Sequence, residues 1–311
     1  MRSHLVANRH FGNIGDIWKH LPLAEILAIE KPARYWESHA GSAQYALTHS
    51  AARDYGVFRL ISHAADSLAV ASSSFLCLLD GLRTGRGRLA TYPGSPRIAM
   101  ELLGKRTRYL FCDIDGRSLA TIKQAARRLA FNPKKIACVK GDGVGAVLEA
   151  AERLRPESLR RTLVLVDPCA GDAPFARREG GPSPMDLFSR LAALGAKSIL
   201  WYSFDSRSEK RAAWKSIRAS LAGLGVDAWA SGLWCGEIGL KEIDCDDLGF
   251  NPGVRGCGIL CANLGRASIS ASSRLGYDLA RLYADATVPG GMSGALAFRG
   301  INLDVAVLDN G

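Results

Sequence analysis

Short apolar runs alternate with longer stretches of helical periodicity along most of this 311-residue chain. Such alternation is expected of β-α-β units, in which each strand is followed by a helix that crosses back over a mostly parallel sheet. The expected strands are Ala33–Ser38, Arg108–Asp113, Lys135–Lys140, Thr162–Asp167, Ser198–Ser203, Gly225–Ser231 and a later antiparallel partner, Gly256–Asn263. We therefore predict an α/β fold built on a doubly wound sheet.

Helical spacing dominates the segments between these strands. The expected helices are Ser118–Ala130, Val144–Leu154, Pro184–Leu194 and Ser208–Leu224. Residues 47–91 break the alternation, because much of this stretch is rich in Ala, Ser and Leu at helical spacing. We expect this stretch to form a helical insertion subdomain within a single domain that spans residues 1–311.

The charge balance favours a polyanionic partner. The chain has 40 Lys and Arg against 30 Asp and Glu, a formal net charge of +10. Clustered cations gain affinity for phosphates by releasing counterions. The basic residues concentrate in the segments Arg83–Arg88, Arg97–Arg108, Arg153–Arg161 and Arg207–Arg218. These segments either form one patch or are separate solvated faces, and the sequence leaves both readings open.

No apolar run reaches the roughly 20 residues that a membrane helix needs. The start of the chain is polar and basic, and the eight cysteines are scattered rather than arranged as a disulfide framework. We expect a monomeric, cytoplasmic protein with reduced thiols and no metal site.

Acidic residues follow several of the predicted strands. One strand ends at Asp113, the next leads into Asp142 and Gly143, and a third ends at Asp167. In a doubly wound sheet the carboxyl ends of the strands form the ligand-binding edge. Acids there, without a Gly-rich phosphate-binding fingerprint, favour a nucleoside that lacks phosphates, such as S-adenosylmethionine. Any one of these Asp residues taken alone is more often a helix cap or turn residue.

Several segments together resemble the RlmJ-type 23S ribosomal RNA adenine-N6 methyltransferases, over about residues 8–300. The segments are His10-Phe-Gly-Asn-Ile-Gly-Asp16-Ile-Trp-Lys19-His20, Tyr35-Trp-Glu-Ser-His39-Ala-Gly41, Tyr92-Pro-Gly-Ser95-Pro96, Asp142-Gly143, Asp167-Pro168 and Leu200-Trp-Tyr202. The resemblance implies a Rossmann-like class I fold, S-adenosylmethionine as cofactor and ribosomal RNA, free of ribosomal proteins, as substrate.

The resemblance also implies a set of site residues. Asp113 would bind the ribose of the cofactor, and Asp142 and Gly143 would line its adenine. The methionine end would lie near Lys19, His20 and His39, with Gly41 in the same loop and Ser95 nearby. Asp167 and Pro168 would be catalytic, because a carboxylate and a backbone carbonyl of this motif hold the two hydrogens of the reacting amine.

The sequence departs from the family where catalysis is expected. Asp-Pro-Cys-Ala, residues 167–170, replaces the family's Asp-Pro-Pro-Tyr, whose aromatic ring stacks on the flipped base. Such stacking contributes about 1–3 kcal/mol. Phe175, Tyr202 or Phe204 could replace it.

This departure leaves two alternatives to RNA methylation. One is a methyltransferase of the same fold that acts on a small molecule or a peptide. The other is a non-catalytic relative that only binds RNA.

Overall fold

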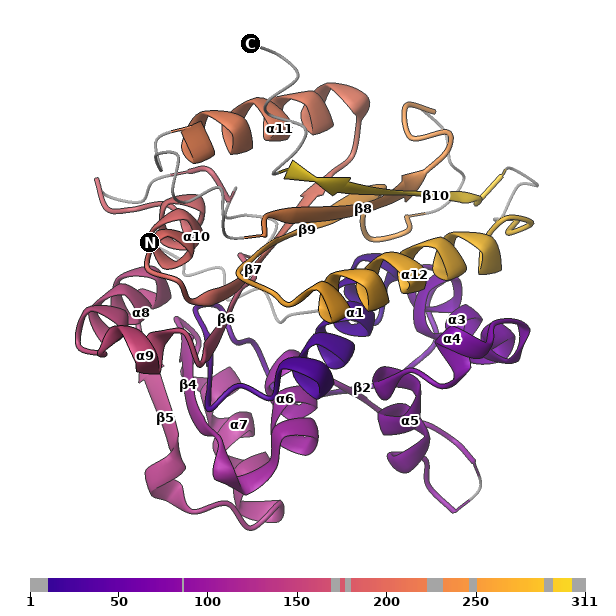
Figure 1. Cartoon of the computed structure of the whole chain (residues 1–311). Coiled ribbons are helices and arrows are strands. Elements are labelled where there is room, and N and C mark those ends of the chain that lie inside the picture. The colour runs from indigo at the N-terminus through magenta and orange to yellow at the C-terminus, as the bar shows by residue number, and fades with distance from the viewer. Residues whose placement is uncertain are drawn as a thin grey trace, which may run out of the picture.

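An eight-stranded sheet forms the centre of the computed structural model, which describes residues 11–85, 87–168, 174–176, 180–222, 232–245, 251–287 and 293–303 (Figure 1). Its strand order is β10-β8-β9-β7-β6-β1-β4-β5. The strands are β1 (Arg34–Glu37), β4 (Arg108–Asp113), β5 (Ile136–Lys140), β6 (Thr162–Val166), β7 (Lys197–Phe204), β8 (Trp234–Leu240), β9 (Gly256–Ala262) and β10 (Leu296–Asn302). The five strands β5, β4, β1, β6 and β7 pair in parallel, whereas β9, β8 and β10 join antiparallel.

Helices cover both faces of this sheet (Figure 1). One core lies under α1 (Ile14–Glu30), α6 (Ser95–Leu103), α7 (Gly116–Arg128) and α12 (Arg266–Leu282). The other lies under α8 (Gly143–Glu152), α10 (Pro184–Ala193) and α11 (Arg207–Ala222), with the short α9 (Pro156–Leu159) beside them. Within the described ranges, no helix has the length and apolarity that crossing a membrane requires.

The predicted parallel sheet is confirmed, and so are the four predicted helices, with ends that differ by a few residues. The antiparallel strand predicted at Gly256–Asn263 is also confirmed as β9. The predicted strand Gly225–Ser231 lies outside the described residues. Two strands of the large sheet, β8 and β10, were not predicted, and neither were the short strands Gln44–Ala46 and Thr91–Pro93. β8 and β10 are antiparallel strands at one side of the sheet, where the β-α alternation of the sequence has ended.

The stretch between β1 and β4 contains short helices that are joined to the main body by a two-stranded sheet. Its strands, β2 (Gln44–Ala46) and β3 (Thr91–Pro93), pair antiparallel. The helical elements between them are α2 (Ala51–Arg53), η1 (Asp54–Phe58), α3 (Arg59–His63), η2 (Ala64–Asp66), α4 (Leu68–Ala71) and α5 (Ser74–Gly81). Two further short turns, η3 (Gly104–Arg106) and η4 (Pro133–Lys135), lead into β4 and β5.

The first turn of α1 is fixed from several sides. Asn13 caps the helix, because its side-chain oxygen accepts from the backbone N–H of Asp16 at 3.0 Å. The backbone N–H of Val57 donates to the carbonyl of Gly12 at 2.9 Å. A Cβ atom on Gly56 would lie 2.2 Å from that same carbonyl, so only glycine lets the two segments approach this closely. The start of α1 is therefore held closely against η1.

Gly143 provides a test of this packing. A Cβ atom there would lie 1.7 Å from the carbonyl oxygen of Ser38, a backbone atom that cannot rotate away. We predict that Gly143→Ala lowers the free energy of unfolding by about 1–3 kcal/mol, measured by urea denaturation. Gly81→Ala is the control, since nothing lies within 4 Å of its added methyl group. Equal stability of the two variants would show that the loop after β1 does not pack against α8 as described.

Candidate functional site

The order of the sheet reverses between β1 and β6, because the chain runs outward from β1 to β4 and β5 and then returns to the other side. At such a switch point the loops after the two strands separate and leave room for a ligand. Glu37 ends β1, and Asp167 follows the last residue of β6. The predicted ligand-binding edge is therefore where these carboxylates and the start of α1 meet.

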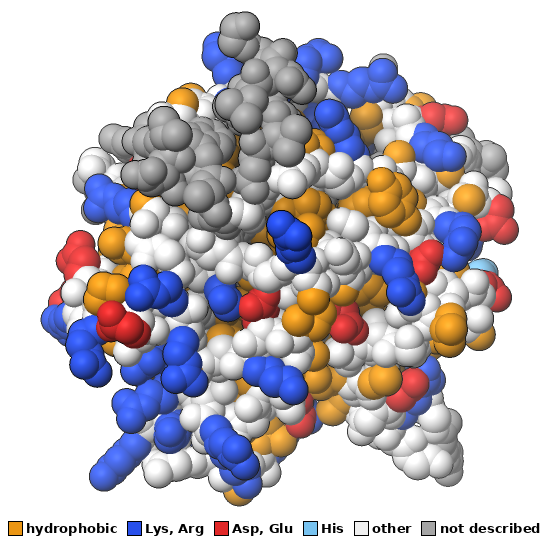
Figure 2. Space-filling model, in the orientation of Figure 1, with side chains coloured by type: hydrophobic (Ala, Val, Ile, Leu, Met, Phe, Trp, Pro, Cys, Tyr) orange, Lys and Arg blue, Asp and Glu red, His pale blue; other side chains and the backbone are white. Residues whose placement is uncertain are grey.

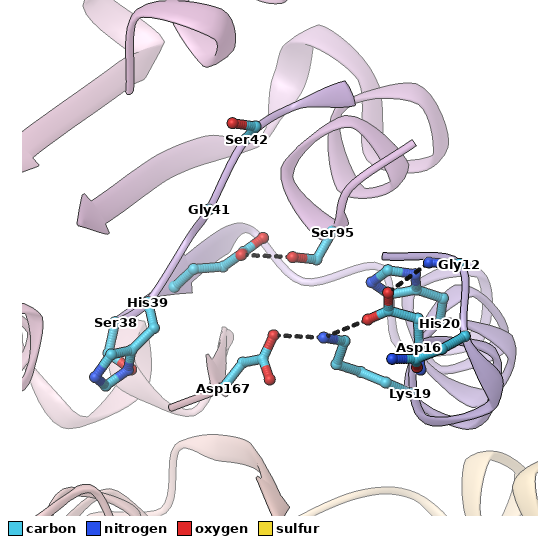
Figure 3. Close-up of polar contacts among 12 residues, drawn as sticks. Gly12, Asp16, Lys19, His20, Ser38, His39, Gly41, Ser42, Ser95 and Asp167 are labelled. Carbon is cyan, nitrogen blue, oxygen red and sulfur yellow. Dashed lines mark hydrogen bonds and ion pairs between the residues drawn. The ribbon is translucent and has the colours of Figure 1, made fainter. Parts of the chain in front are cut away.

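A buried lysine connects two carboxylates at this edge (Figure 3). The Lys19 ammonium donates to Asp167 Oδ2 at 2.7 Å and lies 3.0 Å from Asp16 Oδ1. The other oxygen of Asp16 accepts from the backbone N–H of Gly12 at 2.7 Å. All three charged side chains are only 11–14% exposed. We call Asp16, Lys19 and Asp167 the ion triad.

Burial and the neighbouring charges shift the pKa values of the three ion-triad side chains in different directions. Burial disfavours the Lys19 ammonium, but the two carboxylates outweigh this effect and raise the pKa of Lys19. Burial also opposes ionisation of Asp16, yet Lys19 lowers the pKa of that carboxyl. For Asp167, burial dominates and raises the pKa in spite of Lys19. Lys19 is thus the cation that keeps Asp167 charged in a poorly solvated place.

Glu37 lies beside the ion triad with one oxygen satisfied. The Ser95 hydroxyl, at the start of α6, donates to Glu37 Oε2 at 2.8 Å (Figure 3). Glu37 Oε1 is buried and has no hydrogen-bond partner of regular geometry in the described part of the chain. Burial raises the pKa of Glu37 to about 8, even though the Ser95 hydrogen bond favours ionisation. The Tyr35 side chain also interacts with this carboxyl and favours its ionisation.

Asp113 is held by the backbone at the end of β4. Its two carboxylate oxygens accept from the N–H groups of Gly41 and Asp115, each at 2.7 Å. Gly41 has φ +61°, a conformation that glycine adopts without strain. Asp113 is half-buried, so its oriented oxygens retain acceptor capacity toward the edge of the sheet. The structure thus brings Gly41 and Asp113 together, as the sequence suggested.

Asp142 caps α8. Its carboxylate accepts from the backbone N–H groups of Val144 and Gly145, both at 3.0 Å. Asp142 therefore has the helix-capping role that is common for a single Asp after a strand. The next residue, Gly143, lies against the carbonyl of Ser38, so the loops after β1 and β5 are in contact.

The two expected histidines have different surroundings. His20 is only 3% exposed, and its Nδ1 lies 2.8 Å from the Tyr92 hydroxyl. Burial, together with the nearby Lys19 charge, lowers the pKa of His20 to about 3, so its ring is neutral at physiological pH. His39 is half-buried just after β1, and its Nδ1 lies 2.9 Å from Ser38 Oγ (Figure 3).

Around the expected catalytic motif, Asp167 and Pro168 are described, whereas Cys169 and Ala170 lie outside the described residues. Tyr202 and Phe204 are 1% and 3% exposed within the core under α11, and the Tyr202 hydroxyl donates to Glu237 at 2.7 Å. These two rings therefore do not offer a free face to a base. Phe175 is half-buried and packs against the same core.

Two residues of the site were not predicted from the sequence. Asp16 belongs to the segment that carried the family resemblance, but its contact with Lys19 arises from helical spacing and was not inferred. Glu37 belongs to another segment of the resemblance, but no role was predicted for it. The signal that could have identified it is its position at the end of a strand, like Asp113 and Asp167.

A doubly wound sheet with acidic groups at the carboxyl ends of β1, β4 and β6 is typical of S-adenosylmethionine-dependent methyltransferases with the class I, Rossmann-like fold. The family described as ribosomal RNA large subunit methyltransferase D, RlmJ, matches residues 30–180. Ribosomal RNA large subunit methyltransferase J of Haemophilus influenzae is 25% identical over 224 residues, which cover 68% of this chain and 74% of that protein.

A solved structure agrees with this assignment at the level of fold. It is a Legionella pneumophila protein of family DUF519, 19% identical, with a TM-score of 0.67 over 94% of this chain and 98% of that one. The chain is an S-adenosylmethionine-dependent methyltransferase that is similar to the RlmJ family over residues 30–180. The predicted enzyme class and cofactor, S-adenosylmethionine, are confirmed with it. The family match contains Asp167 but not the other two residues of the ion triad, because Asp16 and Lys19 precede residue 30.

The pKa of Glu37 gives a prediction about stability. Folding raises this pKa from 4.5 to about 8, so the folded state favours the protonated carboxyl. The contribution of Glu37 to the free energy of unfolding is therefore fully present below about pH 4.5. It is lost as the pH rises toward 8, by at most about 1.4 kcal/mol per pH unit. We predict that Glu37→Gln removes this loss, measured by urea unfolding across that range. The exposed Glu152→Gln is the control, and parallel pH curves for wild type and Glu37→Gln would contradict the assignment.

Proposed function

We propose that this methyltransferase transfers a methyl group from S-adenosylmethionine to N6 of an adenine in 23S ribosomal RNA. The observation that carries the proposal is the Lys19–Asp167 contact, which holds a carboxylate at the switch point of the sheet. The name of the Haemophilus influenzae relative and the excess of basic residues support RNA as the substrate.

The residues present fit the cofactor. Asp113 presents a carboxylate fixed by two backbone donors, and the buried Glu37 carboxyl lies at the end of the neighbouring strand β1. An amino group and a ribose are the groups that such acceptors recognise. When bound, S-adenosylmethionine supplies an electrophilic methyl group. We propose that the cofactor site consists of Lys19, His20, His39, Gly41, Ser95, Asp113, Asp142 and Gly143.

The chemistry required of the chain is modest. The exocyclic amine of adenine is a weak nucleophile, because its lone pair is delocalised into the ring. Asp167 and the backbone carbonyl of Pro168 would each accept one hydrogen of the amine, which orients the nitrogen for in-line attack. Lys19 keeps Asp167 charged and in place. Asp167 is then the acceptor for the proton that the amine loses.

The form of the RNA substrate, the oligomeric state, the cellular location and the domain organisation belong to the same proposal. We propose that the substrate is ribosomal RNA free of ribosomal proteins, that the enzyme acts as a monomer in the cytoplasm, and that residues 47–91 form an insertion subdomain within one domain. The ring that stacks on the flipped base is not Tyr202 or Phe204, since both are buried.

Transfer of a labelled methyl group to 23S ribosomal RNA from cells that lack this protein tests the proposal. We predict labelled N6-methyladenosine after nucleoside analysis. In Asp167→Ala we expect kcat to fall by at least about 100-fold while the cofactor still binds, because an oriented proton acceptor contributes that much. The exposed Asp66→Asn is the control and should retain wild-type turnover.

Three other results of this experiment would contradict the proposed function. Label on a different nucleoside would overturn the N6 assignment. Cofactor binding without any label on RNA would favour a small molecule or a peptide as acceptor. Salt-sensitive RNA binding without methyl transfer, unchanged in Asp167→Ala, would indicate a non-catalytic relative.

A further inference from the structure

Four neighbouring strands begin with a basic residue at the same end of the sheet. Arg34 and Arg108 are the first residues of β1 and β4, while Arg161 and Lys135 directly precede β6 and β5. These strands are adjacent in the order β6-β1-β4-β5. With strands about 4.8 Å apart, the four residues form a row about 14 Å long.

Local contacts confirm that the row is continuous. Arg34 pairs in register with Arg108, and the backbone N–H of Arg34 donates to the carbonyl of Arg161 at 3.3 Å. The Lys135 ammonium donates to the carbonyl of Arg106 at 3.3 Å. Together with Arg106 and the exposed Lys134, the row forms what we call the amino-end patch: Arg34, Arg106, Arg108, Lys134, Lys135 and Arg161.

The positive charges of the amino-end patch are not balanced by nearby carboxylates in the described residues. None of its six cations forms an ion pair with a carboxylate in the described part of the chain. Partial burial and the charges of Arg108 and Arg161 lower the pKa of Arg34, a sign that like charges are crowded here. An external polyanion would relieve this repulsion.

The surrounding surface has the same sign. Residues 105–140 contain ten Lys and Arg against two Asp, so this segment carries eight of the ten net positive charges of the chain. Figure 2 shows Lys and Arg side chains gathered at the lower left, over the region of α7, β4 and β5. Much of the basic excess therefore lies on one surface rather than on separate faces.

The patch is remote from the ion triad. Asp167 follows the carboxyl end of β6, whereas Arg161 precedes its amino end. At about 3.3 Å per residue the two ends are roughly 15–20 Å apart, so the patch does not touch the reacting adenine. The row is comparable in length to about four phosphates measured along one strand of a duplex.

We propose that the amino-end patch binds the phosphate backbone of a part of the substrate RNA that is remote from the methylated adenine. This proposal rests on the proposed function for the identity of the RNA. The catalytic edge is lined by the carboxylates of Asp16, Asp113 and Asp167, which repel phosphates. Affinity for a long RNA therefore comes from the opposite end of the sheet.

The test compares two triple variants with the same change in charge. Arg108→Gln, Lys134→Gln and Arg161→Gln remove half of the patch through exposed side chains. Arg211→Gln, Lys215→Gln and Arg218→Gln remove the same residue types from the exposed face of α11. Binding to protein-free 23S ribosomal RNA is measured across salt concentrations, beside methyl transfer to that RNA and to a short hairpin around the methylated adenine.

We expect the patch triple to lower the slope of log affinity against log salt by about two to three units. Its KM for the long RNA should rise about tenfold or more at physiological salt with kcat retained. The short hairpin should be methylated as by wild type, and the α11 triple should keep the wild-type slope.

An unchanged salt slope, an equal loss in the α11 triple, or a loss of kcat on the short hairpin would each overturn the proposal. Patch-dependent binding to phosphatidylserine vesicles with unchanged RNA binding would also overturn it in favour of a membrane surface. If the wild-type protein binds RNA through the patch but transfers no methyl group, the proposal about the patch stands and the proposed function is rejected.

Discussion

The contact between the Lys19 ammonium and the Asp167 carboxylate joins the two parts of the chain that form the candidate site. Asp167 comes from the sheet, at the end of β6, and Lys19 comes from the first turns of α1. Removing one member of a buried ion pair leaves an uncompensated charge, which is costly. The position of α1 therefore determines whether Asp167 can be held as an anion. The Asn13 cap and the close approach of Gly56 to Gly12 fix that position.

The sheet also separates two kinds of charge. Its carboxyl edge presents the acids that suit a nucleoside and an amine, and its amino edge presents the row Arg161, Arg34, Arg108 and Lys135. Acids that orient small groups and cations that bind phosphates would weaken each other if they were mixed. Placing them at opposite ends of strands roughly 20 Å long lets one domain carry both.

Much of the fold could be predicted from the sequence, because buried parallel strands and amphipathic helices leave a clear periodic signal. β8 and β10 leave a weaker one: β8 has two glycines and a buried Glu237, and β10 alternates buried and exposed residues only in part. The site was predictable as a set of strand ends. The partner that each side chain contacts was not predictable, since Asp142 caps α8 and His20 is buried against Tyr92. These partners depend on how distant segments pack together, and local sequence patterns do not show this.

A double-mutant cycle between Lys19 and Asp167 measures whether the two side chains act together in methyl transfer. The methyl-transfer rate would be measured for wild type, Lys19→Met, Asp167→Asn and the double variant, with cofactor binding measured for each. If Lys19 acts by holding Asp167, the double variant should be no slower than Asp167→Asn alone, a coupling of at least about 1 kcal/mol. Losses that multiply would contradict the account, because they would show that Lys19 and Asp167 act independently.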